Sequence, residues 1–347
     1  MLNKVRDNPF RHSRALVPGL ALLMAVLFAA SLLSGRLDIG ISELGELMSA
    51  LISGHPVKAD LASKQMVFWW IRVPRCVMAV SVGMGLSVSG AVYQAMFRNP
   101  LVSPDILGVA AGATFGAALG LVLPSVSFSQ VHILAFCFGI AAVGLSLTIA
   151  RIIAVRPVIV LVLSGMVVMS FFNALLMILK YLSDPYEELP SIVFWTMGGL
   201  SRTTWQDAGL TTLVTGVGVF LIMMLRFRLN VLSLGDVQAR ALGMNPAAYR
   251  GVLITGTSLM VAMTVATCGQ ISWIGLIVPH MARTLAGPDH QRMLPVTALL
   301  GGIFLIGADM MARSLTTSEI PVGIITALTG APCFAYLLFK NRGSGWL

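Results

Sequence analysis

The chain has 347 residues, of which 57% are hydrophobic and only 11% are charged, and its mean hydropathy of +0.88 lies far above that of soluble domains. This composition excludes a soluble globular protein and indicates an integral membrane protein. The net charge of +9 comes mainly from basic residues that border apolar runs. It therefore indicates membrane topology rather than nucleic-acid binding.

Apolar runs between charged residues predict an all-α protein with about ten transmembrane helices, because a bilayer-spanning helix needs roughly 20 apolar residues. The run 106–150 breaks at residues 124–129 and predicts two spans. In the run 251–282, Gly269 and Pro279 predict a full helix followed by a short, broken one. The remaining predicted spans occupy the runs 15–34, 76–97, 157–179, 208–225, 293–308 and 320–339.

The basic residues predict the orientation of these spans, since Lys and Arg are retained on the cytoplasmic side. A cytoplasmic N-terminus places 15 of the 23 Lys and Arg residues inside and 8 outside, so both termini are expected in the cytoplasm. The first apolar run has the basic flank of a signal peptide but no clean A-x-A-like cleavage site, which favours a retained helix. Residues 1–347 are therefore predicted to form one multi-pass transmembrane domain.

Between the first two spans, residues 35–64 carry apolar side chains at helical spacing and predict an amphipathic helix at the outer membrane interface. Trp69 and Trp70 then mark the headgroup level at the entry of the second span. In the third span, four small residues spaced four apart predict a ridge for close helix packing. They are Gly108, Gly112, Gly116 and Gly120.

The chain has no phosphate-binding loop of its own. None of its lysines, which are Lys4, Lys58, Lys64, Lys180 and Lys340, is preceded by glycine. Asp309 is the only carboxylate well inside an apolar span, which is thin support for a proton- or sodium-coupled carrier. We expect the energy for transport to come from a partner subunit.

The cytoplasmic segment 226–250 is the candidate contact with such a partner. It contains a short amphipathic helix that ends at Gly243 and Pro246. The side chains on its apolar side are Leu234, Val237, Ala241 and Leu242. This helix fits either a groove in a soluble protein or the membrane surface.

Cysteine and histidine are sparse. Cys76, Cys137, Cys268 and Cys333 lie singly in apolar segments, so packing roles are expected rather than disulfides or metal ligands. His280 and His290 are interpreted as structural. No metal or cofactor site and no catalytic residue is predicted.

Seven motifs identify a resemblance. They are "IRVPR" (71–75), "SGAVYQAMFRNPLVSPDILGVAAGA" (89–113), "LGDVQARALGM" (234–244), "GQISWIGLIVPHMAR" (269–283), "GPDHQRMLP" (287–295), "GADMMAR" (307–313) and "EIPVGIITALTGAPCFAYLL" (319–338). Over residues 65–340 they resemble the FecCD-type permease subunits of iron-chelate and cobalamin ABC importers.

The resemblance implies a type II ABC importer permease fold of ten spans, present as a homodimer or paired with a related permease in the bacterial inner membrane. It implies two cytoplasmic ATP-binding subunits, which hold ATP and Mg, and a binding protein that delivers cargo from outside. The chain itself would be a transport subunit and not an enzyme.

The resemblance also implies site residues. Contact with the ATPase would be made by Leu234, Gly235, Asp236, Ala239, Arg240, Leu242 and Gly243. Docking of the binding protein would use Arg72, Arg75 and Arg313, with Arg202 as a weaker candidate in a less similar segment. The fifth span would line the translocation path, with Ser164, Met166, Met169 and Asn173 as candidates.

A ferric siderophore is the expected cargo, with haem, cobalamin or an oxyanion such as molybdate as other candidates. Import would proceed by ATP-driven alternating access. Two other classes stay open on sequence alone. One is an ion-coupled secondary transporter, and the other is a membrane scaffold without cargo.

Overall fold

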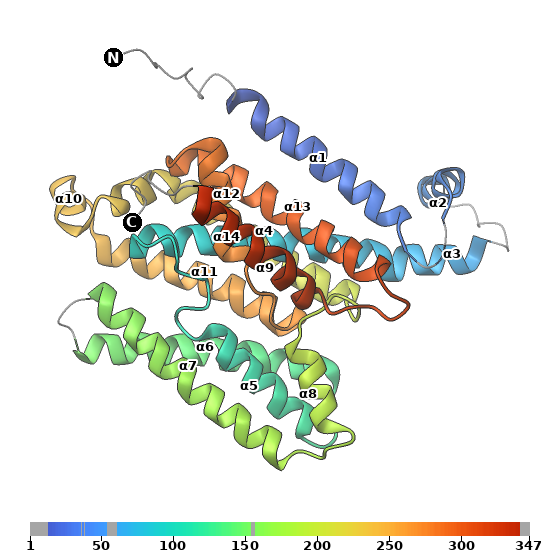
Figure 1. Cartoon of the computed structure of the whole chain (residues 1–347), viewed down its shortest axis with the longest axis horizontal. Coiled ribbons are helices and arrows are strands. Elements are labelled where there is room, and N and C mark those ends of the chain that lie inside the picture. The colour runs from blue at the N-terminus through green and yellow to red at the C-terminus, as the bar shows by residue number, and fades with distance from the viewer. Residues whose placement is uncertain (1–12, 36, 38, 54–60, 154–156, 341–347) are drawn as a thin grey trace.

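A computed structural model describes residues 13–35, 37, 39–53, 61–153 and 157–340 of the chain, and all regular secondary structure in them is helical (Figure 1). The elements are α1 (Ser13–Leu33), α2 (Ile41–Ser53), α3 (Ala62–Val67), the π-helical turn η3 (Phe68–Arg72), α4 (Val73–Phe97), α5 (Val109–Val122), α6 (Phe128–Ile153), α7 (Pro157–Leu182), α8 (Glu188–Thr196), α9 (Trp205–Ser233), α10 (Asp236–Ala241), α11 (Pro246–Cys268), α12 (Ile274–Ala286), α13 (His290–Ser314) and α14 (Val322–Lys340). Both chain ends lie outside the described residues, so their cytoplasmic location stays a prediction.

The described helices are those of a multi-pass membrane protein. Seven are long and apolar enough to cross a membrane, namely α1, the continuous helix 62–97, α6, α7, α9, α11 and α13. Shorter apolar helices are α5, α12 and residues 322–337 of α14. The break predicted at 124–129 is confirmed, because α5 ends at Val122 and α6 begins at Phe128.

The run 251–282 is divided at Gly269 into a full helix and a short one, as predicted, but the short helix is not broken at Pro279. Helix α12 is continuous through Pro279, and the chain leaves the helical conformation between Gly269 and Trp273. Both residues have positive φ angles, 69° and 73°, which a right-handed helix does not accommodate. Helix α9 extends beyond its predicted span and ends at Ser233. The first third of the predicted cytoplasmic segment 226–250 therefore belongs to this helix.

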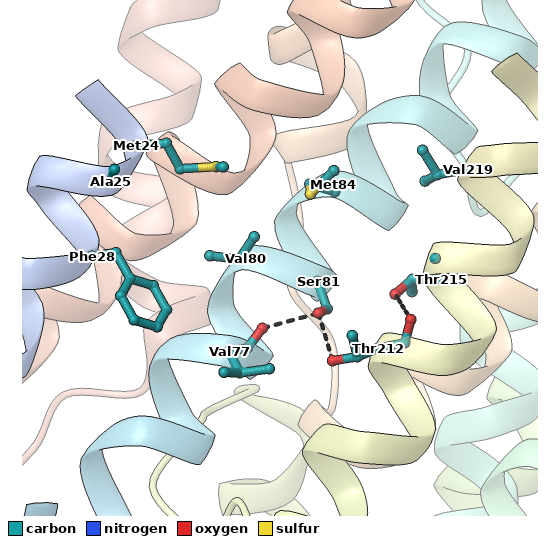
Figure 2. Close-up of a pocket in the computed structure, with 11 residues that line it drawn as sticks. Met24, Ala25, Phe28, Val77, Val80, Ser81, Met84, Thr212, Thr215 and Val219 are labelled. Carbon is teal, nitrogen blue, oxygen red and sulfur yellow. Dashed lines mark hydrogen bonds between the residues drawn. The ribbon is translucent and has the colours of Figure 1, made fainter. Parts of the chain in front are cut away.

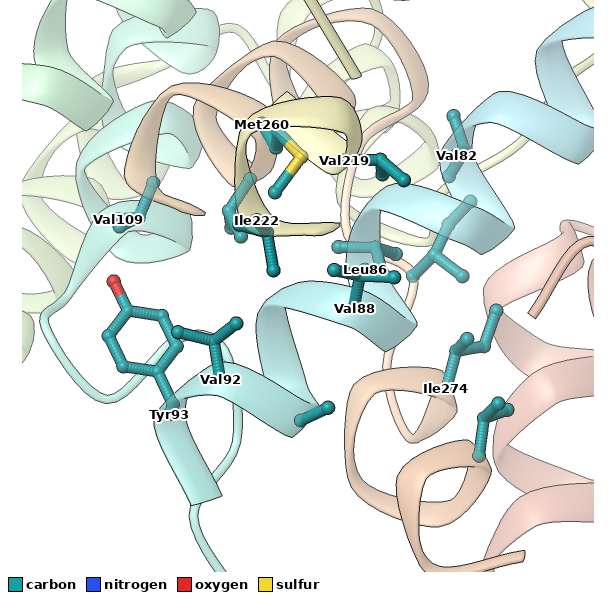
Figure 3. Close-up of a cluster of buried hydrophobic side chains, with 14 of the residues drawn as sticks. Val82, Leu86, Val88, Val92, Tyr93, Val109, Val219, Ile222, Met260 and Ile274 are labelled. Atoms are coloured by element: carbon teal, nitrogen blue, oxygen red, sulfur yellow. The ribbon is translucent and has the colours of Figure 1, made fainter. Parts of the chain in front are cut away.

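Helix α4 forms the centre of the bundle. Figure 3 shows its Val88 and Val92 in one cluster with Ile222 of α9, Met260 of α11 and Ile274 of α12. Glycines allow the backbones to approach closely, since a Cβ on Gly90 would lie 1.8 Å from the carbonyl oxygen of Gly275. Such small-residue contacts replace the hydrophobic driving force that is absent between helices in lipid.

Helices α5, α6, α7 and α8 gather on one side of the bundle, and α1 lies on the opposite side (Figure 1). The predicted glycine ridge packs on α6, where a Cβ on Gly112 or Gly116 would lie 2.5 Å from a backbone oxygen. Gly108 is not part of this ridge. It is the N-cap of α5 with φ 78°, and it faces α7.

Candidate coupling site and translocation face

Helix α10 is held between two glycines at one end of the bundle. It begins after Gly235 (φ 112°) and ends before Gly243 (φ 74°), and both backbone conformations favour glycine. The N–H of Gly243 donates to the carbonyl of Arg240 at 2.9 Å. The predicted short helix and its C-terminal stop are therefore present in the structure.

The apolar residues of this segment divide into an anchor and an exposed set. Ala239 is fully buried and fixes α10 to the bundle. Val237 is 77% exposed, and Leu234 and Leu242 are also exposed. One large apolar side chain on a fixed helix and two that flank the helix, all outside the bundle, are typical of a protein-binding surface.

A salt bridge ties α10 to the start of α11. The guanidinium of Arg250 donates to both carboxylate oxygens of Asp236, with Nη1 and Oδ2 2.8 Å apart. Hydrogen bonding to Arg250 lowers the pKa of Asp236, and the charges of Arg240 and Arg98 lower it further. The carboxylate therefore lies among three cations.

Residues 98–108, which we call the corner segment, connect α4 to α5 and lie against α10. Arg98 ends α4 in a left-handed conformation with φ 50°. Its Nη1 would lie 3.1 Å from a Cβ placed on Gly235. At the other end, the carboxylate of Asp105 accepts the N–H of Ala110 at 2.7 Å and caps the first turn of α5.

The corner segment also contacts α6, α7 and α12 closely. A Cβ on Gly275 of α12 would lie 2.2 Å from Pro104, and a Cβ on Gly165 of α7 would lie 2.0 Å from the carbonyl oxygen of Ile106. Ser146 of α6 donates to the carbonyl of Leu107 at 3.0 Å. A continuous series of packed contacts thus runs from α10 through the corner segment to α7.

Helix α7 presents a large apolar face with no helix packed on it among the described residues. Its exposed side chains include Val167, Phe171 and Met177. Of the predicted path residues, Met166 and Asn173 are exposed on α7, and Met169 is half-buried.

Ser164 is a correction to the predicted path. Its side chain is only 2% exposed, and its hydroxyl donates to the carbonyl of Val160 at 2.6 Å. It lies two residues from Met166, about 200° around a helix of 3.6 residues per turn. Ser164 therefore faces the interior of the subunit.

The three arginines predicted for docking are buried at the end of the bundle opposite α10. Arg75 and Arg313 share the fully buried carboxylate of Asp309, at 2.9 Å and 3.1 Å, and Arg75 also donates to Glu319 at 2.8 Å. We call these four residues the ion cluster. Arg72 donates to the carbonyls of Leu32 and Leu33 at the end of α1, where a cation also complements the helix dipole.

Docking on these three arginines requires exposed guanidinium groups, and the structure instead places them in a buried network. The physical reason is that α3, η3 and α4 form one continuous helix from residue 62 to 97. Arg72 and Arg75 consequently lie within a helix rather than at its exposed end. The spacing of four residues along one helix indicates the pair of Asp309 and Arg313 from the sequence. Nothing near Glu319 in the sequence indicates that it pairs with Arg75.

The histidines and cysteines have internal surroundings. His290 Nδ1 lies 2.7 Å from the side-chain oxygen of Asn230, and His280 is buried beside the ring of Phe334. The four cysteines are unpaired thiols. In the described part of the chain, no three His, Cys, Asp or Glu side chains converge as metal ligands would.

Residues 22–340 match the FecCD transport family. The chain belongs to this family. The molybdate import system permease protein MolB of Haemophilus influenzae is 37% identical over 327 residues, which cover 94% of this chain and 96% of that protein. An iron chelatin transport system permease protein of Helicobacter pylori is 36% identical over 324 residues, covering 93% and 98%. A solved metal-chelate type ABC transporter in an inward-facing conformation gives a TM-score of 0.82 at 36% identity, covering 94% of this chain and 99% of that one.

This FecCD protein is therefore a permease subunit of an ABC importer, and it has the all-helical fold of a type II importer permease. The resemblance inferred from the motifs of residues 65–340 is confirmed, and the matched region begins earlier, at residue 22. Permeases of this kind act with ATPase and binding-protein partners. The alternative of an ion-coupled secondary transporter is not favoured.

Proposed function

We propose that this permease imports a ferric siderophore or a similar iron chelate across a bacterial inner membrane. The observation that carries the cargo class is the exposed face of α7, where Met166, Phe171 and Met177 present large apolar side chains. Flexible thioethers and an aromatic ring suit a bulky amphipathic chelate better than a small hydrated anion. The relative named for iron chelatin supports this cargo.

Molybdate is the second candidate, because a relative of similar identity is named for its import. Uptake of radioactive ferric siderophore and of radioactive molybdate would be compared in cells that express the chain with its ATPase and binding protein. We expect siderophore uptake that depends on this chain and no molybdate uptake. Molybdate uptake alone would assign the oxyanion instead.

Two ATP-binding subunits would supply the energy by docking on α10. The support is the geometry of α10 and its two flanking leucines, which present three exposed apolar side chains. The helix is fixed by buried Ala239 and by the salt bridge between Asp236 and Arg250. Burying one valine in an interface contributes about 1.5–3 kcal/mol. Loss of that contact corresponds to roughly tenfold or more in affinity.

The coupling proposal is tested with two charge substitutions on adjacent exposed positions. Val237→Glu should weaken co-purification of the ATP-binding subunit about tenfold, because it places a carboxylate in an apolar contact. Gln238→Glu adds the same charge to an exposed polar position and should leave binding near wild type. Equal affinities for the two variants would rule out α10 as the contact.

The subunit would work as a homodimer in which the exposed face of α7 is covered by its counterpart. Movement of α10 would reach α7 through the corner segment and open the path between the two subunits in alternation. The binding protein would dock at the end opposite α10. Arg202 is exposed there, with its guanidinium 5.4 Å from the ring centroid of Phe128, whereas the guanidinium groups of Arg72, Arg75 and Arg313 have partners within the chain.

The ion cluster also argues against ion-coupled transport. Asp309 is the intramembrane carboxylate that a coupling ion would need, yet it contacts both Arg75 and Arg313. Two guanidinium groups already occupy the oxygens of this carboxylate, so a coupling cation would have to displace them. Asp309 is therefore better explained as part of the structural network.

A further inference from the structure

An apolar groove with a volume of about 620 Å³ opens between α1, α4 and α9 (Figure 2). Helix α1 packs mainly along α13 and makes few contacts with α4, which leaves this space beside the central helix. The residues that line it are Met24, Ala25 and Phe28 of α1, Val77, Val80, Ser81 and Met84 of α4, and Thr212, Thr215, Gly216 and Val219 of α9.

The hydroxyl groups in the groove already have partners. Ser81 Oγ donates to the carbonyl of Val77 at 2.9 Å and lies 2.8 Å from Thr212 Oγ1, so Thr212 is the donor of that second bond (Figure 2). Thr215 Oγ1 donates to the carbonyl of Thr211 at 2.6 Å. All three hydroxyl protons are used within the chain, so the wall offers no hydrogen-bond donor to a polar occupant and favours an apolar one.

The depth of the groove in the membrane follows from three tryptophans. Trp69 and Trp70 precede α4, Trp205 begins α9, and the indole N–H of Trp205 donates to the carbonyl of Trp69 at 2.7 Å. Tryptophans at span ends lie at the headgroup level. At 1.5 Å per residue, Thr212 lies about 10 Å and Val219 about 20 Å along α9 from Trp205.

These depths fall within one leaflet, because half of a bilayer is about 20 Å thick when the headgroup region is included. The groove therefore has apolar walls where lipid tails are the surrounding solvent. We propose that it binds an acyl chain of a phospholipid whose headgroup lies beside Trp70 and Trp205. The acyl chain fills the space between α1 and α4 and joins α1 to the rest of the bundle.

Two matched leucine substitutions on α9 test this lipid site. A Cβ on Gly216 or on Gly209 would meet no atom within 4 Å, so both positions accept a side chain. They lie seven residues apart on one helix face, but only Gly216 lines the groove. Gly216→Leu therefore fills the groove, and Gly209→Leu places the same side chain on the helix nearer to Trp205. Ala25→Phe blocks the groove from α1 as a second variant.

The purified chain would be delipidated in detergent, and the retained phospholipid counted by native mass spectrometry. We expect wild type and Gly209→Leu to keep a lipid that Gly216→Leu and Ala25→Phe lose. Added palmitoyl-oleoyl phosphatidylglycerol should raise the melting temperature of only the first two proteins. Equal lipid retention in all four proteins, or none in wild type, would overturn the proposal. A melting-temperature shift with ferric siderophore but not with lipid would assign the groove to cargo. A groove-dependent change of oligomeric state would assign it to a second copy of the chain.

Discussion

The ion cluster shows how a membrane protein keeps four charged side chains inside a helical bundle. Arg75 and Arg313 bring two positive charges, and Asp309 and Glu319 bring two negative ones, so the group is neutral. The charges come from α4, α13 and the segment before α14, while Arg313 also donates to the hydroxyl of Ser31 in α1 at 2.6 Å. The cluster therefore joins four parts of the chain at one end of the bundle.

Removal of the shared carboxylate should be costly. Asp309→Ala removes the anion that two buried guanidinium groups share, and Arg75 alone keeps a second carboxylate, that of Glu319. Breaking a buried pair in this way destabilises proteins by about 3–5 kcal/mol. Glu319 is one-third exposed, so Glu319→Gln should cost less than about 1 kcal/mol. Thermal unfolding in detergent, followed by circular dichroism, measures both. Similar melting temperatures for the two variants would show that Asp309 is not the centre of the cluster.

The salt bridge of α10 predicts a pH dependence at the opposite end of the molecule. Asp236 has a pKa below its ordinary value of 3.8 because Arg250 hydrogen-bonds to it. A lowered pKa means that the folded state binds fewer protons, so this stabilisation is present above pH 3.8 and is lost as the pH falls below it. Limited proteolysis of the α10 region should therefore accelerate in wild type below pH 3.8. Asp236→Asn should be cleaved faster than wild type already at neutral pH, and its cleavage rate should not rise further below pH 3.8. The same rise in this variant as in wild type would exclude the pair of Asp236 and Arg250 as its cause.

Glycine positions decide how closely the helices and the corner segment approach one another. A Cβ on Gly165 of α7 would meet the carbonyl oxygen of Ile106, but a Cβ on Gly144 of α6 would meet no atom within 4 Å. The two residues share helical backbone and differ in packing. Only the first should matter for the contact between the corner segment and α7.

Alanine at these two glycines should have effects of opposite sign. Gly144→Ala should stabilise the protein by up to about 1 kcal/mol through helix propensity. Gly165→Ala gains the same propensity but displaces the corner segment, so we expect a net loss of about 1–3 kcal/mol and less transport per ATP hydrolysed. Unfolding in detergent and transport-coupled ATPase assays measure the two effects. Equal changes in stability and in transport per ATP for the two variants would show that the contact between the corner segment and α7 is not important.

The sequence predicts the elements well where a local signal ends a helix. Gly243 follows the end of α10, Pro246 begins α11, and the polar stretch at 124–129 separates α5 from α6. It predicts poorly where burial depends on distant segments. Hydropathy places Arg72 and Arg75 at a span entrance, because it has no information on the end of α1 or on Glu319, which surround them in the folded chain. The resemblance likewise selects the fifth span but does not distinguish the inward Ser164 from the exposed Met166.

At the scale of the whole molecule, α4 is an enclosed central helix and α7 is an outer helix with an exposed face. Helix α4 is enclosed by α9, α11, α12 and α13, while α7 lies on the side of the bundle away from α1 (Figure 1). The exposed face of α7 is where a second subunit would pack. In lipid, such packing comes from close contact rather than from water exclusion, so it depends on the shape of the face.

Two pairs of substitutions distinguish a dimer face from ordinary lipid contact. Val167 and Phe171 on α7, and Val217 and Phe220 on α9, are all exposed to similar extents. Changing either pair to Gln carries the same cost in lipid, but only the α7 pair would remove contacts between subunits. In liposomes at low protein density, single-molecule photobleaching should find mainly dimers for wild type and for the α9 variant, and mainly monomers for the α7 variant. Because insertion costs are matched, a shift to monomers in both variants would indicate general destabilisation, and dimers in both would place the interface elsewhere on the subunit.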